Sequence, residues 1–233
     1  MSLMASVAGI SHAKDNEQPP KGLRVLFLGN SYTAYNSLPE QVRTLCASVS
    51  VNVTYEARTP GGTTLQDHAG NKDVQNLIKE SRWDYLVLQE QSLRPLADPG
   101  KMFGAVKALN VFAEHNNTRL LFFETWPRRN LPSSYKELSR VYDRAAELVG
   151  GEIAPVGEAW MLAIQDHPNI KLYDPDGSHP SPAGSYLAAC VISASITGED
   201  PTTFQAPLPK GVSKSQAEKL RKVAAANRRS SSP

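Results

Sequence analysis

The sequence predicts one three-layer α/β/α domain built on about five parallel strands. Three observations predict it. Short, unbroken apolar runs such as "RVLFLG", "DYLVLQ" and "RLLFFET" are typical of strands buried on both faces of a sheet. Helical patterns separate these runs, and the links between the two kinds of segment are short. This alternation indicates right-handed βαβ units, in which helices cover both faces of a parallel sheet.

Each element follows from its own segment. From the apolar runs we expect strands at residues 24–29, 52–57, 84–89, 118–124 and 152–155. The helical patterns predict helices at residues 38–50, 72–81, 100–115, 134–149, 157–166, 181–196 and 215–227. Ser215 and Glu218 have the spacing of a capping box for the last of these helices. In a flavodoxin-like strand order the first and third strands are neighbours, and ligands bind where their carboxyl ends meet.

The composition is that of a globular protein of 233 residues, with 40% hydrophobic and 21% charged residues. From Pro201 onward there are seven Lys or Arg and one acid, so this segment has a net charge of +6. The net charge of the whole chain is +2, so the remaining residues carry about −4. A mildly acidic body gives no reason to expect a nucleic-acid partner. The only two cysteines, Cys46 and Cys190, lie in apolar helical patterns, where we expect buried thiols rather than a disulfide or a metal site.

The chain divides into a leader at 1–22, the α/β domain at 23–200, and a Pro-rich connection with a basic helix at 201–233 that packs on or beside the domain. The leader resembles the end of a secretory signal, with residues 11–13 as a small-residue cleavage site. It favours a periplasmic or secreted protein. A cytoplasmic chain is the alternative, because the basic start and longer apolar core of a signal are missing. No apolar stretch reaches the roughly 18 residues that span a bilayer.

Ser31 follows the first strand directly, in the segment "LFLGNSYT". Gly-Asn-Ser is ordinary turn chemistry, so Ser31 by itself could simply begin a helix. A serine at this edge of the sheet could equally act as a nucleophile, which needs a base and a group that orients the base.

His179 is the best candidate for that base among the five histidines. It lies in "LYDPDGSHPSPAG", a loop rich in Pro, Gly, Asp and Ser, three residues after Asp176. At this spacing a carboxylate can bind one imidazole nitrogen and leave the other free to accept a proton. Residues so spaced also serve as turn or cap residues, and the pair alone is weak evidence.

Nucleophilic attack on a carbonyl also needs hydrogen-bond donors for the oxyanion that forms. The backbone N–H groups of Ser31, Gly61 and Gly62 are candidates, because glycines allow close approach of the backbone to a ligand. The side-chain amides of Gln89 and Gln91, in "QEQS" after the third strand, are further candidates.

Together these segments resemble the SGNH (GDSL-type) hydrolase superfamily over residues 24–197. "GNS" at 29–31 matches its first block, "GGTT" at 61–64 its glycine block and "DGSH" at 176–179 its last block. The third block, usually Gly-x-Asn-Asp, is replaced by Gln89-Glu90-Gln91-Ser92. We favour Gln89 as the donor in place of the family's Asn because it directly follows the apolar run, whereas Gln91 aligns better by counting.

The resemblance implies the SGNH-hydrolase fold and a serine esterase that needs no metal or organic cofactor. Ser31, His179 and Asp176 would form the catalytic triad, and short acyl esters, above all acetyl esters on a carbohydrate, would be the substrates. Asn30, Trp126 and Arg128 are candidates for contacting the substrate, although Trp126 could equally pack under a loop. A catalytically weak carbohydrate-binding or scaffold protein is the alternative, and a lipase or thioesterase for longer acyl chains is a second.

Overall fold

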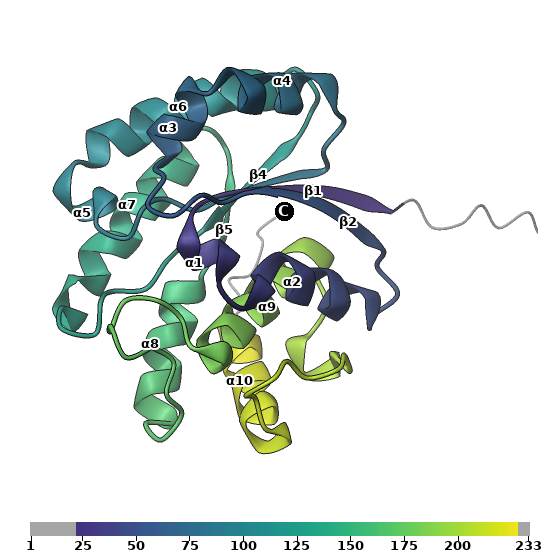
Figure 1. The fold of residues 1–233 in the computed structure, drawn as a ribbon, viewed down its shortest axis with the longest axis vertical. Helices are drawn as coiled ribbons and strands as arrows, with labels where there is room; N and C mark the ends of the chain where they lie inside the picture. The colour runs from purple at the N-terminus through teal and green to yellow at the C-terminus, as the bar shows by residue number, and fades with distance from the viewer. Residues whose placement is uncertain (1–21, 228–233) are drawn as a thin grey trace, which may run out of the picture.

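The computed structural model describes residues 22–227 (Figure 1). The leader predicted at residues 1–22 therefore lies, apart from Gly22, outside the described residues. Within them a sheet of five strands is parallel throughout, in the order β2-β1-β3-β4-β5. The strands are β1 (Leu23–Leu28), β2 (Val53–Arg58), β3 (Tyr85–Leu88), β4 (Arg119–Phe123) and β5 (Glu152–Ala154).

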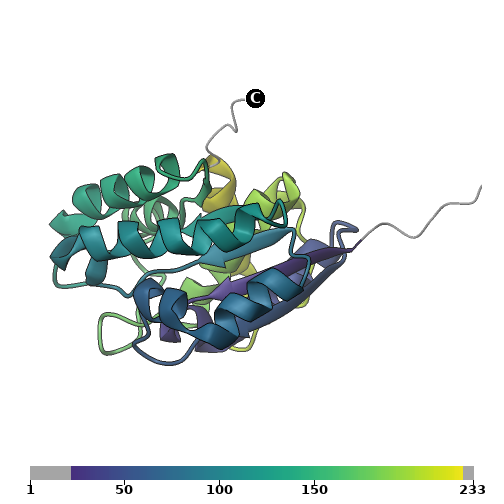
Figure 2. The same cartoon turned by 90° about the horizontal axis from the view of Figure 1, so that it is seen from above.

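Helices cover both faces of the sheet. One face carries α2 (Leu38–Ala47), α8 (Val156–Asp166), α9 (Pro182–Thr197) and α10 (Lys214–Ala226). The other carries α3 (Leu65–Gly70), α4 (Lys72–Glu80), α6 (Pro99–Glu114) and α7 (Tyr135–Glu147). Seen from above, α4, α6 and α7 form one layer across the sheet (Figure 2). The result is the predicted three-layer α/β/α architecture.

The continuous apolar runs have a direct structural cause. Successive side chains of a strand point to opposite faces. Val25 and Phe27 of β1 therefore pack against α2 and α9, while Leu26 and Leu28 pack against the helices of the other face. All four side chains are fully buried. Since both faces are covered, no position of this strand segment tolerates a polar residue.

The predicted elements agree with the observed ones to within a few residues, and the missed elements are all short. Two of the missed helices, α1 (Ser31–Ala34) and α5 (Arg94–Ala97), have four residues each. The six-residue α3 and the 3₁₀ segments η1 (Tyr35–Ser37), η2 (Pro132–Ser134) and η3 (Pro201–Thr203) were also not predicted. Segments of this length are too short to show a helical period.

The last helix begins earlier than predicted. Ser213 and Gln216, not Ser215 and Glu218, form the capping box of α10. Its buried residues join the core formed by α8 and α9, so the described part of the basic segment is packed on the domain. No helix within residues 22–227 is both long and apolar enough to cross a bilayer. Cys46 and Cys190 are buried free thiols, as predicted.

Candidate active site

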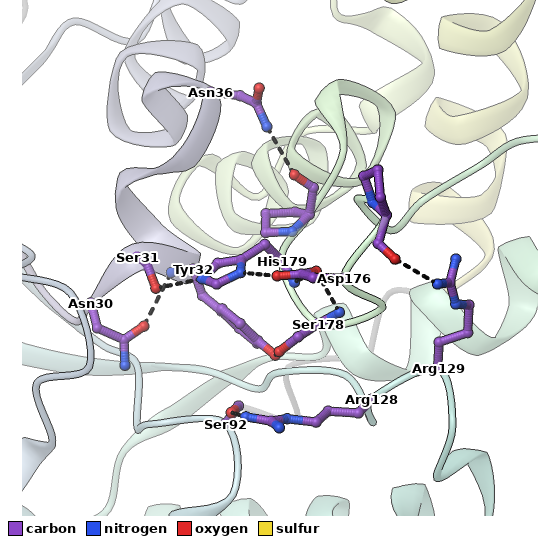
Figure 3. A network of polar contacts seen from close by, with 12 residues as sticks. Asn30, Ser31, Tyr32, Asn36, Ser92, Arg128, Arg129, Asp176, Ser178 and His179 are labelled. Carbon is purple, nitrogen blue, oxygen red and sulfur yellow. Dashed lines mark hydrogen bonds and ion pairs between the residues drawn. The ribbon is translucent and has the colours of Figure 1, made fainter.

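Ser31 lies at the point where the strand order reverses. It is the first residue of α1 and follows β1, which is flanked by β2 and β3. Open parallel sheets bind ligands at the carboxyl ends of the strands at such a point. Asp176 and His179 approach the same place from the loop that precedes α9, and Figure 3 shows their side chains beside Ser31.

The three side chains form a continuous hydrogen-bonded chain. Ser31 Oγ lies 2.9 Å from His179 Nε2, and His179 Nδ1 lies 2.5 Å from Asp176 Oδ2. With the proton on Nδ1, the imidazole donates to the carboxylate, and Nε2 is free to accept the Ser31 hydroxyl proton. Ser31 and His179 are 148 positions apart in the sequence, yet their side chains are in contact. With Asp176 they have the arrangement of a nucleophile, a base and an acid that orients the base.

Local backbone geometry holds Asp176 under the imidazole. Its second oxygen, Oδ1, accepts the backbone N–H groups of Ser178 (2.9 Å) and His179 (3.0 Å). Gly177 turns the chain between them with φ of +70°, a conformation that favours glycine. The hydrogen bond from His179, followed by the one from the Ser178 backbone, lowers the pKa of Asp176 to about 2. The carboxylate therefore stays ionised at neutral pH, ready to stabilise an imidazolium.

Aromatic residues hold the loop that carries His179. Tyr32 donates or accepts a hydrogen bond with Ser178 Oγ at 2.7 Å, and Trp126 Nε1 donates to the Ser178 carbonyl at 3.1 Å. The ring of Tyr35 stacks on the imidazole, with centroids 4.4 Å apart and planes 15° from parallel. The imidazole and its loop are therefore held by residues of α1 and η1 and by Trp126 in the loop after β4.

The turn that carries Ser31 is held by buried polar groups. Gln89 Oε1 accepts the Asn30 backbone N–H (3.0 Å) and the Thr33 hydroxyl (2.9 Å). His68, also buried, contacts the Gly29 carbonyl through Nε2 at 2.8 Å. A side chain at Gly29 would lie 2.5 Å from Thr33 Oγ1 and 2.6 Å from Gln89 Oε1, so only glycine fits there.

Gln89 does not occupy the position of an oxyanion donor, which corrects our preference for it. Its side chain is fully buried, and its Nε2 donates to the Glu90 carbonyl at 2.6 Å. With its oxygen bound to Asn30 and Thr33 as well, the amide supports the turn that carries Ser31. Gln91 is partly buried and its Oε1 accepts the N–H groups of Leu93 and Arg94, so it caps α5.

The glycine loop is tied to the turn that carries Ser31. Asn30 Nδ2 donates to the Thr63 carbonyl at 3.0 Å, just after Gly61 and Gly62. Both glycines are exposed, and Gly62 has φ of +75°. Among residues 22–227, the backbone N–H groups of Ser31, Gly61 and Gly62 have no hydrogen-bond partner. These three donors are available to a ligand.

Two of the three predicted substrate contacts are buried, which corrects those assignments. Asn30 is 2% exposed because its side chain caps α1, with Oδ1 accepting the Tyr32 N–H. Trp126 is fully buried, stacked between Tyr32 (4.8 Å) and Trp160 (3.8 Å). It therefore packs beneath the His179 loop and has no face free for a sugar ring. Arg128, the third, is only partly buried.

The sequence reasoning missed Tyr35, His68 and Glu90. Glu90 is fully buried, and its Oε1 accepts the backbone N–H groups of Leu65 and Gln91, which joins the loops after β2 and β3. Closeness in sequence was the available signal: Tyr35 follows Ser31 by four residues, and His68 follows the glycine loop. Nothing in the sequence tells which way these side chains point.

The buried acceptor of Gln89 gives a stability prediction. Gln89→Met is expected to lower the free energy of unfolding by about 2–4 kcal/mol, because the Asn30 N–H and the Thr33 hydroxyl would each lose a buried acceptor. Gln91→Met removes a helix cap and a long hydrogen bond to Ser92 Oγ (3.4 Å), and is expected to cost about 1 kcal/mol. Urea denaturation of both variants measures the difference. Equal losses in the two variants would contradict the supporting role of Gln89.

Comparisons with known proteins identify structures that share this architecture. No protein-family model matches the chain, and neither does any curated protein. A candidate SGNH hydrolase from Slackia heliotrinireducens is 28% identical with a TM-score of 0.64, over 76% of this chain and 100% of the other. A DUF4886 family protein from Bacteroides uniformis is 20% identical with a TM-score of 0.71, over 88% and 94%.

A mutant of an acetyl-xylooligosaccharide esterase from Geobacillus is also similar, at 14% identity and a TM-score of 0.62, over 80% of this chain and 98% of the other. At 20% identity and below, the likeness is one of fold alone. The sheet order, its flanking helices and these neighbours support a hydrolase on this fold. The chain therefore has the fold of the SGNH (GDSL-type) hydrolases.

Proposed function

We propose that the protein is a serine esterase that hydrolyses short acyl esters, above all acetyl esters, with Ser31 as nucleophile, His179 as base and Asp176 as the orienting acid. One observation carries the proposal: the unbroken hydrogen-bonded chain from Ser31 Oγ through the imidazole to the Asp176 carboxylate. The same three residue types, in the same order of contacts, perform acyl transfer on unrelated folds.

In the first half of the reaction, Ser31 Oγ forms a bond to the ester carbonyl carbon while His179 Nε2 takes the hydroxyl proton. The imidazolium that forms carries its positive charge beside Asp176, whose lowered pKa keeps the carboxylate ionised. His179 then gives the proton to the departing alcohol oxygen as the carbon–oxygen bond breaks. The acyl group is left on Ser31.

In the second half, water takes the place of the alcohol. His179 Nε2 removes a proton from the water as its oxygen attacks the acyl carbon. The proton then returns to Ser31 Oγ as the acid leaves. Asp176 needs only to hold the imidazole in one tautomer through both halves, which fits its two additional hydrogen bonds to backbone N–H groups.

The oxyanion of each tetrahedral intermediate would be stabilised by backbone donors. The N–H groups of Ser31, Gly61 and Gly62 are the candidates, since no other described residue accepts a hydrogen bond from them. Preorganised donors of this kind contribute a large part of catalysis in acyl transfer. Because Gln89 is engaged below the turn, the proposal assigns it no part in binding the oxyanion.

Acetyl esters on a carbohydrate are the proposed substrates. One protein with the same fold is named as an acetyl-xylooligosaccharide esterase, and another, from Pseudoalteromonas, as an esterase. A periplasmic or secreted location remains a prediction from the leader at residues 1–22.

An acyl-length series tests the function. The rate constant kcat/KM is measured for 4-nitrophenyl acetate, butyrate and octanoate. We expect the highest value for acetate and a fall with chain length. A maximum at octanoate would contradict the short-acyl proposal and favour a lipase or thioesterase. A folded protein that hydrolyses none of the three would favour a non-catalytic binder.

A further inference from the structure

Arg128 is a partly buried cation with no acidic partner among residues 22–227. It lies in the loop after β4, and its Nη2 donates to Ser92 Oγ at 3.1 Å. Its Nε is fully buried and has no hydrogen-bond partner among the described residues. No carboxylate within residues 22–227 forms an ion pair with this guanidinium. Removing a charge from water without pairing it is unfavourable, which indicates that a partner is missing.

Five other arginines of the described residues are placed differently. Arg43, Arg58, Arg119 and Arg144 each pair with a glutamate near the surface. Arg129, the next residue in the chain, is exposed and donates to the Pro175 carbonyl. Within residues 22–227, Arg128 Nε is the only guanidinium nitrogen that is fully buried without a hydrogen-bond partner.

The position of Arg128 is next to the candidate active site. Arg128 and Ser92 both lie close enough to the Tyr32 hydroxyl to interact with it, and Tyr32 also binds Ser178, the neighbour of His179. In Figure 3 the Arg128–Ser92 pair lies on one side of the chain formed by Ser31, His179 and Asp176, and Asn36 lies on the other. Arg128 is thus linked through Tyr32 to the loop that carries His179.

We propose that Arg128 binds a carboxylate on the ester substrate, so that the enzyme prefers esters that carry this charge. The inference rests on the proposed esterase function. Arg128 Nη1 makes no hydrogen bond to a described residue and is not fully buried, so it can donate to an incoming oxygen. Arginine and carboxylate form strong, directional hydrogen bonds. A single guanidinium with one hydroxyl partner matches one carboxylate better than a phosphate, which carries more charge and three acceptor oxygens.

The carboxylate could be on the acyl group or on the alcohol, and two pairs of esters distinguish these sources. Mono-4-nitrophenyl succinate and its methyl ester test the acyl side. 3-Acetoxybenzoate and 3-acetoxybenzamide test the alcohol side. For each pair the quantity of interest is the ratio of kcat/KM for the charged ester to that for the neutral ester, measured at one ionic strength.

In at least one pair we expect the wild-type ratio to exceed the ratio of Arg128→Gln by about 10- to 100-fold, the effect of losing a charge-assisted hydrogen bond. Arg82→Gln is the matched control, because Arg82 is exposed and precedes β3, at the opposite end of the sheet from the site. This variant is expected to keep the wild-type ratio. A ratio that Arg128→Gln leaves unchanged in both pairs overturns the inference, as does a wild type without any preference for charge.

Circular dichroism checks that Arg128→Gln is folded, and Arg128→Lys is a second variant that tests the inference if it is not. Arg128→Lys keeps the charge but loses the planar fork, and is expected to lower the ratio about threefold to tenfold. An unchanged ratio in this variant counts against the inference.

Failure of the esterase function is separable from failure of the anion site. If the wild type hydrolyses none of the esters, the proposed function fails. Calorimetric titration with succinate and with 3-hydroxybenzoate still tests Arg128. Binding of either that is lost in Arg128→Gln or Arg128→Lys supports the carboxylate site, and absence of binding to the wild type contradicts it.

Discussion

Ser31→Ala is expected to lower kcat for 4-nitrophenyl acetate by a factor on the order of 10³ or more, because the nucleophile of a triad cannot be replaced by its partners. The fold should persist. Ser31 is only partly buried, and its hydroxyl bonds only to His179 among the described residues. Initial rates at saturating ester and thermal unfolding of both proteins measure the two expectations.

Ser133→Ala is the matched control for this experiment, since Ser133 is an exposed serine in η2. It should retain wild-type kcat. A fluorophosphonate probe gives an independent readout, because it labels an activated serine covalently. We expect labelling of the wild type and of Ser133→Ala but not of Ser31→Ala. Unchanged hydrolysis in Ser31→Ala would end the serine-nucleophile proposal.

His179→Ala is expected to have an effect of the same order, about 10³-fold or more in kcat. Without the imidazole, Ser31 has no base within hydrogen-bond distance among the described residues, and Asp176 has no imidazole to orient. His115→Ala is the control, because His115 is exposed at the end of α6 and contributes no contact to Ser31. It should leave kcat unchanged.

The double variant Ser31→Ala/His179→Ala tests whether the residues act as a unit. If they do, the double variant should be no slower than the slower single variant, because either substitution already removes the whole nucleophilic route. Losses that multiply in the double variant would mean that Ser31 and His179 act independently. That result would contradict a mechanism in which His179 activates Ser31.

Packing around the imidazole explains how a partly exposed site keeps its geometry. The His179 side chain is 27% exposed and the Asp176 side chain is 49% exposed, so contacts with the surrounding protein are needed to hold both in place. Tyr35 stacks on one face of the ring, and Tyr32 contacts it edge-on at 5.6 Å. Tyr32 in turn stacks on the buried Trp126. The aromatic column thus connects the imidazole to the protein core.

Features that depend on local sequence were predictable. A strand covered on both faces must be apolar at every position. The apolar runs that end before Gly29 and Gln89 could therefore be predicted as buried strands. Asp176 and His179 meet within one short turn, and their contact needs only a glycine that accepts a positive φ. Placement of Ser31 at the sheet's switch point followed from the βαβ alternation.

Features that depend on distant contacts were not predictable in the same way. Gln89 and Gln91 share one residue type and lie two positions apart, yet one is buried under the turn that carries Ser31 and the other caps a helix. The difference arises from contacts such as that of Gln89 with Asn30, 59 positions away. Trp126 likewise faces the core because Tyr32 and Trp160 enclose it.

The sequence by itself determined the strands, the long helices and the class of sheet, because hydrophobic periodicity acts over a few neighbouring positions. It also singled out Ser31, Asp176 and His179 as candidates, through turn chemistry and the resemblance of their segments to the SGNH motifs. Only the tertiary structure decided that Gln89, Asn30 and Trp126 support the site from within and that Arg128 has no acidic partner in the described part of the chain. The direction of a side chain depends on which distant groups compete for it, and those are brought together only by the folded chain.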